Sequence, residues 1–578
     1  MRARSFCPRR HLVDAIESGL SPHSASIGRP APALLVTAAL AWACCPAPAA
    51  LATTYVVDTA NDTTTPGKTT LRQAVFEANG SANNIVQFDA SLNGSTITLS
   101  QGEIAITQPM YLIGPGAGKL TISGNDATRL FNISAPTNTL ITVKLSGLTL
   151  THGKCTGICK GGAVYAKNVS LTVQDAVLDY NASAYGGAIY SYDSAFVYAV
   201  SELTGTTIAK NTASGSSAGF SFTGGSALHV ADSIIDANTA AKGAGGGYVH
   251  DIPYVTIARS RITGNKAQLL SGGGLRLYDA YVRIDDSVIS GNTSDANGGG
   301  VALFDGTATL TGDTIAGNSA TSNGGGIFAD DTHVSVLTYL TVQQSTVSGN
   351  SATTYGGGID VRRVSTFTVN RSLISGNSVA DPAGGGGGIA IGYAKSRSYL
   401  NNSTVYNNYA YTNGGGVGIF NAADQTTFNG ATIAQNYTFG STSNGILGAG
   451  STALLNSIVA YNFSRYHSQD LDGSGSIFES YSLVRAVGGA SITTITGNRN
   501  GEDPLLGPLA VNGGPTLTMM PASSPSKSPA LDTGEVIPPP SGTDQRGLPR
   551  SANGRRDMGA VERQYPEDVV FRNGFDSS

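Results

Sequence analysis

Four aspartates recur at nearly the same distance behind a glycine cluster in the middle of the chain. Each lies four or five residues after the last glycine of its cluster: Asp251, Asp279, Asp305 and Asp331. A row of carboxylates could bind Ca²⁺ or supply a general acid and base. Tyr278 and Phe304 precede two of the aspartates and could stack against sugar rings, and Asp330 adds a further carboxylate. The pattern therefore indicates a candidate stripe for a cation or a glycan.

The same aspartates have a simpler interpretation as turn residues, because Asp commonly ends a strand and begins a turn. A row of unpaired carboxylates also repels itself, which requires a bound cation or full solvation. Catalysis has less support. Arg362 and Arg363 beside Asp360 are the nearest candidates for a lyase base, yet arginine stays protonated near neutral pH. His250 and His333 accompany the row without a Ser or Cys nucleophile at a telling spacing. Turn residues are thus the favoured interpretation.

An asparagine recurs through the same region and sets the spacing of these aspartates. Each copy follows a short β-branched run such as SVISGN or STVSGN, and successive copies lie 26–32 residues apart. Such a period is typical of a solenoid built from stacked repeats. The copies are Asn181, Asn211, Asn238, Asn265, Asn292, Asn318, Asn350, Asn377, Asn408, Asn436 and Asn462.

Inside each repeat the apolar residues alternate with polar ones, as at Leu275 and Leu277 and again at Val282 and Ile284. This period of two excludes a helical solenoid and predicts an all-β parallel β-helix with coils about 4.8 Å apart. After its strand the asparagine can take the left-handed conformation and bond its amide along the axis. Glycine clusters supply tight corners. We expect a structural asparagine ladder that includes Asn238, Asn265, Asn292, Asn318, Asn350 and Asn377.

The composition gives few hints of partners. Charged residues make up 13% of the 578 residues and the formal net charge is −4. Because no basic patch with interleaved aromatics is present, nucleic acid is not an expected partner. We also expect no transmembrane segment in the mature chain, since no later stretch is apolar enough to span a bilayer.

The N-terminus has the features of an export signal. The apolar stretch 33–43 follows Arg29, and residues 50–52 read Ala-Leu-Ala, so the mature chain is expected to start at Thr53. This removes three cysteines and leaves Cys155 and Cys159, which in an exported chain predict a disulfide. A metal site at these cysteines is not expected, because a fourth ligand is missing.

Both ends of the repeat are predicted to be capped. Residues 69–79 carry helical spacing and fit a capping helix over the first coil, whereas the repeat fades after residue 497 into a Pro/Gly-rich cap. The chain is predicted to consist of a leader (1–52), an N-terminal cap with first coils (53–135), the repeats (136–497), a C-terminal cap or anchor-associated region (498–565) and a tail (566–578).

Several segments resemble a group of secreted bacterial proteins. Residues 69–79 (TTLRQAVFEAN) resemble the CSLREA-type signature, although the leading Cys-Ser is replaced here by Thr69-Thr70. The GGAIY and SGNSA segments are similar to the repeats of polymorphic outer membrane proteins. Residues 512–518, 528–532, 544–547 and 557–562 resemble the choice-of-anchor Q region, and 570–576 resembles a terminal tail of exported proteobacterial proteins.

The resemblance implies a right-handed parallel β-helix that is secreted or held at the cell surface or outer membrane of a Gram-negative bacterium. We therefore expect an adhesin-like or glycan-binding protein without a demonstrable catalytic site. Its expected partner is a polysaccharide or another cell-surface ligand, and Ca²⁺ is the one cofactor that the aspartate stripe could take. Two alternatives stay open: a polysaccharide lyase or glycoside hydrolase on the same scaffold, and a structural stalk.

Overall fold

The computed structural model describes most of the chain after the predicted leader. The described residues are 52–135, 139–194, 198–332, 337–392, 396–440, 444–536, 542–550 and 554–564. Apart from Ala52, the predicted leader and its cleavage segment fall outside this part, as do His333 and the predicted tail 566–578.

The chain forms an all-β right-handed parallel β-helix of about 15 turns. One turn contains four strands in the order β22 (Gly247–His250), β23 (Tyr254–Ala258), β24 (Arg261–Thr263) and β25 (Lys266–Ala267). Equivalent strands of successive turns pair in parallel and build four sheets, which we call C (14 strands), A (17 strands), B (15 strands) and D (11 strands) after the order of those four strands. The predicted parallel β-helix is therefore confirmed.

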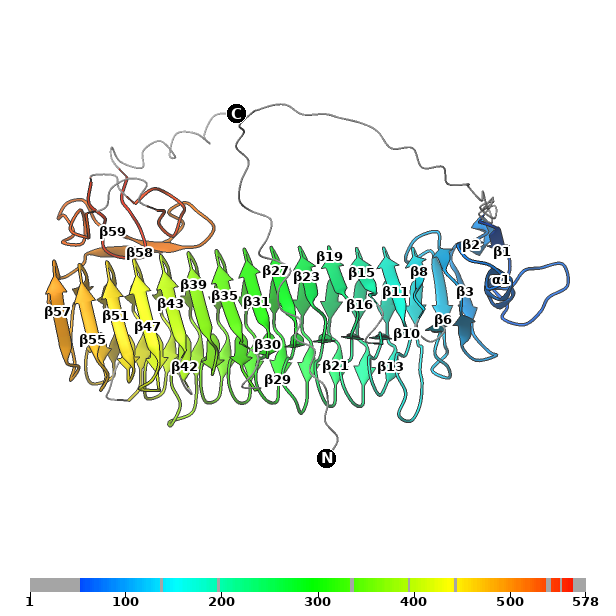
Figure 1. Cartoon of the computed structure of the whole chain (residues 1–578), viewed down its shortest axis with the longest axis horizontal. Coiled ribbons are helices and arrows are strands. Elements are labelled where there is room, and N and C mark those ends of the chain that lie inside the picture. Colours follow the sequence, from blue (N-terminus) through cyan, green and yellow to red (C-terminus); the bar gives the residue numbers. More distant parts are fainter. Residues whose placement is uncertain are drawn as a thin grey trace, which may run out of the picture. The chain divides into compact units, whose positions relative to one another are not determined.

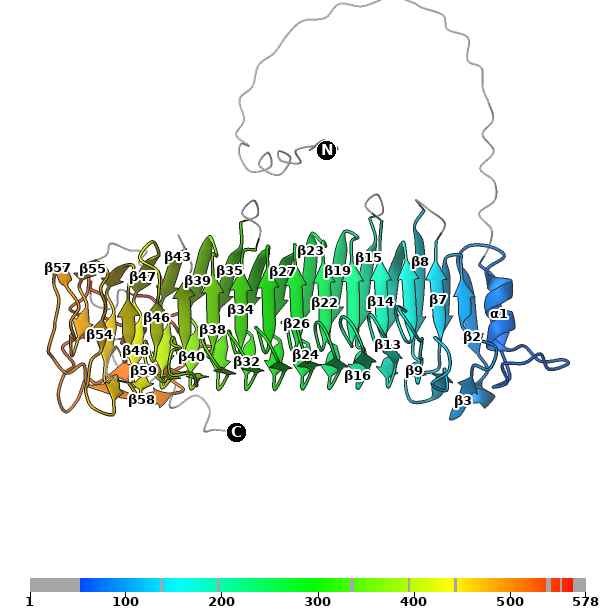
Figure 2. The same ribbon diagram turned by 90° about the horizontal axis from the view of Figure 1, so that it is seen from below.

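The sheets run side by side along the axis of the helix. Figure 1 shows the strands of sheet A in chain order, and Figure 2 shows sheet C after a quarter turn. Inward-pointing residues such as Val249, Leu277 and Leu303 are fully buried, while their neighbours in the same strands point outward. The core is thus one continuous stack of apolar layers, mostly aliphatic with some buried phenylalanines, in which each turn covers the next.

The asparagines form a hydrogen-bonded ladder between sheets B and D. The side chain of Asn318 is fully buried. Its Oδ1 accepts from the backbone N (3.0 Å) and Nδ2 (2.9 Å) of Asn292. Its own Nδ2 donates to the carbonyl of Ile289 (2.9 Å) and to Oδ1 of Asn350 (2.9 Å). The ladder ends on a carboxylate, because the backbone N and Nδ2 of Asn462 both donate to Oδ1 of Asp470 at 2.8 Å.

One local expectation is wrong: the asparagines do not take the left-handed conformation themselves. The residue before each asparagine does so, for example Gly317 (φ 63°) and Lys210 (φ 56°). The turn is completed before the asparagine, so that its amide can point along the axis. Glycine is common at the preceding position because it takes a positive φ at little cost.

The glycine clusters lie against this ladder. A Cβ added at Gly300 would come within 2.7 Å of the carbonyl oxygen of Gly326 and within 3.1 Å of the Asn318 side-chain amide. The two repeated markers are therefore two sides of one packing contact. Only glycine leaves room there for the amide ladder of the neighbouring turn.

A second ladder of small hydroxyl residues runs along the turn between sheets A and B, and Asp313 interrupts it. The backbone N of Ser287 donates to Oδ1 of Asp313 (2.7 Å), and the backbone N of Asp313 donates to Oγ of Ser345 (3.0 Å). Oδ2 of Asp313 is buried and accepts no hydrogen bond. Burial raises the pKa of Asp313 to about 7.

Asp313→Ser is expected to stabilise the protein above neutral pH. The raised pKa means that the folded state binds the proton more tightly, so the contribution of Asp313 to stability is greatest near pH 4 and is lost as the pH rises toward 8. Serine restores the ladder without a charge, and we expect roughly 2–4 kcal/mol of gain at pH 8 and little change at pH 4. Thermal melts of both proteins across this range would check it; an equal difference at both pH values would contradict it.

A helix lies at the N-terminal end, where the sequence predicts one. Helix α1 (Leu71–Ala78) begins at Thr70, whose side chain accepts from the backbone N of Gln73, and its buried face contains Leu71, Ala74, Val75 and Ala78. The helix contacts the first strands β1 (Thr54–Val57), β2 (Asn84–Phe88) and β4 (Ile104–Ile106). Its role as a cap stays a prediction.

The residues after the repeat dock on the side of the last turns. Strands β58 (Leu506–Ala510) and β59 (Thr518–Pro521) pair antiparallel beside them (Figure 1). Gln545 accepts from Oγ1 of Thr404 at 2.6 Å, and Arg550 donates to Oδ1 of Asn402 at 2.6 and 2.9 Å. These contacts lie along the turn between sheets A and B. That the same region caps the C-terminal end of the β-helix stays a prediction. No helix among the described residues is long and apolar enough to cross a membrane.

Candidate functional site

The four predicted aspartates lie in one row at the corner between sheets C and A. Three of them have a positive φ: Asp251 (56°), Asp279 (50°) and Asp305 (52°). Each follows a strand of sheet C, namely β22, β26 (Leu275–Tyr278) and β30 (Val301–Phe304), and begins the turn into sheet A. Asp331 continues the row after β34 (Ile327–Asp330). The aspartates therefore serve as turn residues, and they lie in a row at the same corner of successive turns, as the spacing in the sequence predicts.

The carboxylates of the stripe lie in different environments. Asp251 and Asp279 are exposed, whereas Asp305 is fully buried and accepts from the backbone N of Thr332 at 2.6 Å. Asp330 makes a bidentate contact with Arg363, with N–O distances of 2.9 and 2.6 Å. The stripe thus separates into an open acidic end and a closed, charge-compensated end.

Two tyrosines on the sheet A side of this corner are unusually exposed. Tyr254 and Tyr281 keep 66% and 64% of their surface accessible. They stand directly before the paired residues Val255 and Val282, so they occupy the same position on neighbouring turns. Their exposed rings contribute little to the core, so they are available to contact a ligand.

A row of rings crosses the outer face of sheet C on the other side of the corner. The ring centroids of His250 and Tyr278 are 5.1 Å apart, those of Tyr278 and Phe304 6.2 Å, and those of Phe304 and Phe328 5.7 Å. Phe304 and Phe328 are almost completely covered, whereas His250 and Tyr278 are half-buried. The open part of the ring row therefore lies beside the exposed aspartates.

Arg276 is inserted into this row. Its guanidinium lies 6.0 Å from the centre of the Tyr248 ring and 5.3 Å from that of Phe304. Burial lowers the pKa of Arg276 and raises that of Tyr248. The corner thus combines phenol hydroxyls, one cation and two exposed carboxylates within neighbouring turns.

At the covered end of the row, Asp360 and Arg362 of β38 (Ile359–Arg362) form an ion pair with an N–O distance of 2.7 Å. Burial raises the pKa of Asp360 to about 6, and the nearby Arg362 opposes this shift. Asp360 is only 2% exposed. A substrate could not reach the carboxyl group of Asp360 in this arrangement. Of the two candidate bases, the Arg362 side chain is 18% exposed, whereas that of Arg363 is 52% exposed and pairs with Asp330. The lyase interpretation therefore stays a prediction.

A metal could only bind to this corner through few side chains. Among the described residues, no group of three or more His, Cys, Asp or Glu is arranged to hold a metal ion. Ca²⁺ also takes backbone carbonyl oxygens and water, so binding of Ca²⁺ at Asp251 and Asp279 stays a prediction.

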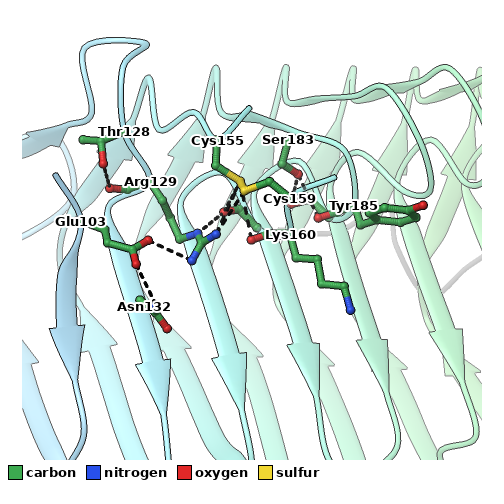
Figure 3. Close-up of a disulfide and its surroundings, with 11 residues drawn as sticks. Glu103, Thr128, Arg129, Asn132, Cys155, Cys159, Lys160, Ser183 and Tyr185 are labelled. Atoms are coloured by element: carbon green, nitrogen blue, oxygen red, sulfur yellow. Dashed lines mark hydrogen bonds and ion pairs between the residues drawn. A yellow bond between two sulfur atoms is a disulfide. The ribbon is translucent and has the colours of Figure 1, made fainter. Parts of the chain in front are cut away.

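Cys155 and Cys159 form a disulfide some turns away from the corner. Arg129 lies against it, with Nη2 3.2 Å from Sγ of Cys159, and its Nη1 pairs with Glu103 at 2.9 Å (Figure 3). Burial lowers the pKa of Arg129. The loop closed by this disulfide therefore contacts the first turns through Arg129, whose side chain is 13% exposed.

The structure adds residues that the sequence pattern does not single out. Tyr254 and Tyr281 belong to the corner, and so do Tyr248 and Arg276 on sheet C. All four occupy outward positions in strands whose inward positions are apolar in turn after turn. Counting residues from each glycine cluster could therefore have identified them as outward-facing. The solvent exposure of these four side chains could not be predicted from the repeat, because it depends on which loops cover each turn.

Comparison with known proteins gives a match to the fold. Residues 161–338 match the family described as right handed beta helix region. A pectate lyase, Pel9A, is 13% identical with a TM-score of 0.28, covering 88% of this chain and 96% of its own. Tailspike protein 3 of bacteriophage CBA120 is 12% identical with a TM-score of 0.33, covering 75% of this chain.

The chain spans only 59% of that tailspike protein. Neither of these two similarities informs the function of this chain. No curated protein matches it. The similarity to CSLREA-type, choice-of-anchor Q and polymorphic outer membrane proteins stays a prediction.

Proposed function

We propose that this β-helix binds a polysaccharide at the corner between sheets C and A. The observation that carries the proposal is the pair of exposed tyrosines, Tyr254 and Tyr281, on neighbouring turns. A polymer that lies along the axis would meet Tyr254 and then, about 4.8 Å further on, Tyr281 of the next turn, while Ala227 and Thr307 occupy the same position on the turns to either side. The two rings are therefore placed to contact successive parts of one sugar chain.

The chemistry of the corner suits sugar units with free hydroxyl groups. Tyrosine offers an apolar ring face for the C–H side of a pyranose and a hydroxyl for hydrogen bonding. The exposed carboxylates of Asp251 and Asp279 accept hydrogen bonds from sugar hydroxyls but repel anionic groups. We therefore expect neutral sugars, or sugars bridged by Ca²⁺, in preference to free uronates at this corner.

We further propose that the protein is exported and displayed at the cell surface. The Cys155–Cys159 disulfide supports this, because disulfides persist in oxidising compartments. Protease treatment of intact cells should release the protein. Recovery from the cytosol with both thiols reduced would contradict the proposal.

A polysaccharide panel separates binding from catalysis. Purified mature chain is expected to retain at least one neutral polysaccharide in pull-down without producing new reducing ends or unsaturated products. Asp279→Asn should leave this binding within a few-fold if the carboxylate only accepts hydrogen bonds, and should abolish any Ca²⁺ dependence if it holds the ion. Release of product from any polysaccharide would favour the lyase or hydrolase alternative, and no retention of any would favour a structural stalk.

A further inference from the structure

The outward position of sheet D changes character over its last three strands. In the eight preceding strands the outward residue is small or polar: Ala182, Thr212, Thr239, Lys266, Thr293, Ser319, Ser351 and Ser378. In β45 (Tyr409–Ala410), β49 (Tyr437–Thr438) and β53 (Phe463–Ser464) it is aromatic. The scaffold does not require rings at this position, because eight turns close without them.

These rings form an ordered surface with their neighbours in the following loops. The centroids of Tyr409 and Tyr437 are 5.6 Å apart, and those of Tyr437 and Phe463 are 5.2 Å apart. A second pair, Tyr411 and Phe439, lies beside them at 5.1 Å. We call this surface, together with the two loop residues after β53, the sheet D patch: Tyr409, Tyr411, Tyr437, Phe439, Phe463, Arg465 and Tyr466.

Arg465 is the only charged member of the sheet D patch. Its guanidinium lies 5.6 Å from the ring centre of Phe439 and 5.6 Å from that of Tyr466. Cation–π contacts of this kind hold an arginine flat against the rings and leave its edge N–H groups free to meet a ligand. Phe463 and Tyr466 remain 44% and 61% exposed, so the patch is open to solvent.

We propose that the sheet D patch is a second carbohydrate-binding site, selective for acidic polysaccharides. The rings repeat once per turn, a spacing comparable to one pyranose unit along an extended sugar chain, and they present both apolar faces and hydroxyls. Arg465 supplies a planar donor pair for a uronate carboxylate. The proposed neutral-sugar corner carries two exposed carboxylates instead, so the two surfaces should sort polysaccharides by charge.

The test compares an oligogalacturonate with a neutral oligosaccharide of equal length by calorimetry on the mature chain. We expect the Tyr254→Ala/Tyr281→Ala variant, in which the neutral-sugar corner is removed, to bind the uronate at least ten-fold more tightly than the neutral chain at low salt, and less tightly as the ionic strength rises. Phe463→Ala with Tyr466→Ala should weaken uronate binding at least ten-fold, and Arg465→Gln should remove the preference for the acidic chain. Tyr399→Ala, an exposed tyrosine of sheet A, serves as the matched control.

Two results would overturn the proposal. One is uronate binding that is absent or unchanged in these variants. The other is a concentration-dependent dimer of the wild type in sedimentation that the Phe463/Tyr466 variant abolishes, because the patch would then be a contact between two copies. The inference is independent of the neutral-sugar corner: Tyr254→Ala and Tyr281→Ala should leave uronate binding intact.

Discussion

Replacing Asn318 with aspartate is expected to destabilise the β-helix by roughly 3–6 kcal/mol at pH 8. The substitution exchanges only the amide nitrogen for an oxygen. That nitrogen donates to the carbonyl of Ile289 and to Oδ1 of Asn350, so the variant places an anion against two acceptors in a fully buried site. Thermal unfolding followed by circular dichroism would measure the loss as a lower Tm.

The pH dependence of this variant distinguishes repulsion from simple loss of a hydrogen bond. Protonation of the new carboxyl group restores one donor, so the Asn318→Asp defect should shrink between pH 8 and pH 4. Asn318→Ala has no such group and should be equally damaging at both pH values. Thr314→Ala, at an exposed position of the same turn, is the control and should change little. A pH-independent Asp variant, or one as stable as the control, would contradict the ladder.

Arg546→Ala is expected to destabilise the fold of the region that follows residue 497. Nη2 of Arg546 lies 2.9 Å from Oδ2 of Asp544, and both side chains are at most 1% exposed. The same guanidinium donates to the carbonyl of Asn512 at 3.1 Å and to that of Glu562. Removing one partner of a buried ion pair leaves the other charge uncompensated, which typically costs about 3–5 kcal/mol.

Limited proteolysis would report this loss where it arises. Cleavage within the region that follows residue 497 should accelerate at least ten-fold, while the circular dichroism signal of the parallel sheets should be retained. Lys527→Ala breaks the more exposed Lys527–Asp532 pair (2.9 Å) of the same region and should cost no more than about 1 kcal/mol. Equal protease resistance of Arg546→Ala and wild type would show that other contacts hold the region.

The regular spacing of the asparagines made the fold predictable. Each turn repeats one pattern, so Asn318 and its counterparts determine which residues stack on which, and the row from Asp251 to Asp331 follows from counting alone. Strict stacking also let the sequence anticipate a buried aliphatic column at positions such as Leu277. Local repetition carries this information because each turn packs only on its neighbours.

The environment of each outward side chain could not be predicted in the same way. Asp305 and Asp279 occupy equivalent positions, yet one is buried under the following turn and the other is exposed. Asp330 is neutralised by Arg363, a partner 33 residues away whose side chain reaches back across the turn. The side docking of residues such as Arg550 joins segments 148 residues apart, which no repeat pattern encodes.

The most direct test of the proposed function is calorimetry with the neutral oligosaccharide that the mature chain retains best. The double variant Tyr254→Ala/Tyr281→Ala should lose at least ten-fold in affinity, because both exposed rings of the corner are removed while the core of each turn is untouched. Tyr399→Ala should bind like the wild type. Wild-type affinity of the double variant, with an unchanged Tm, would contradict the assignment of the sheet C–sheet A corner as the polysaccharide site.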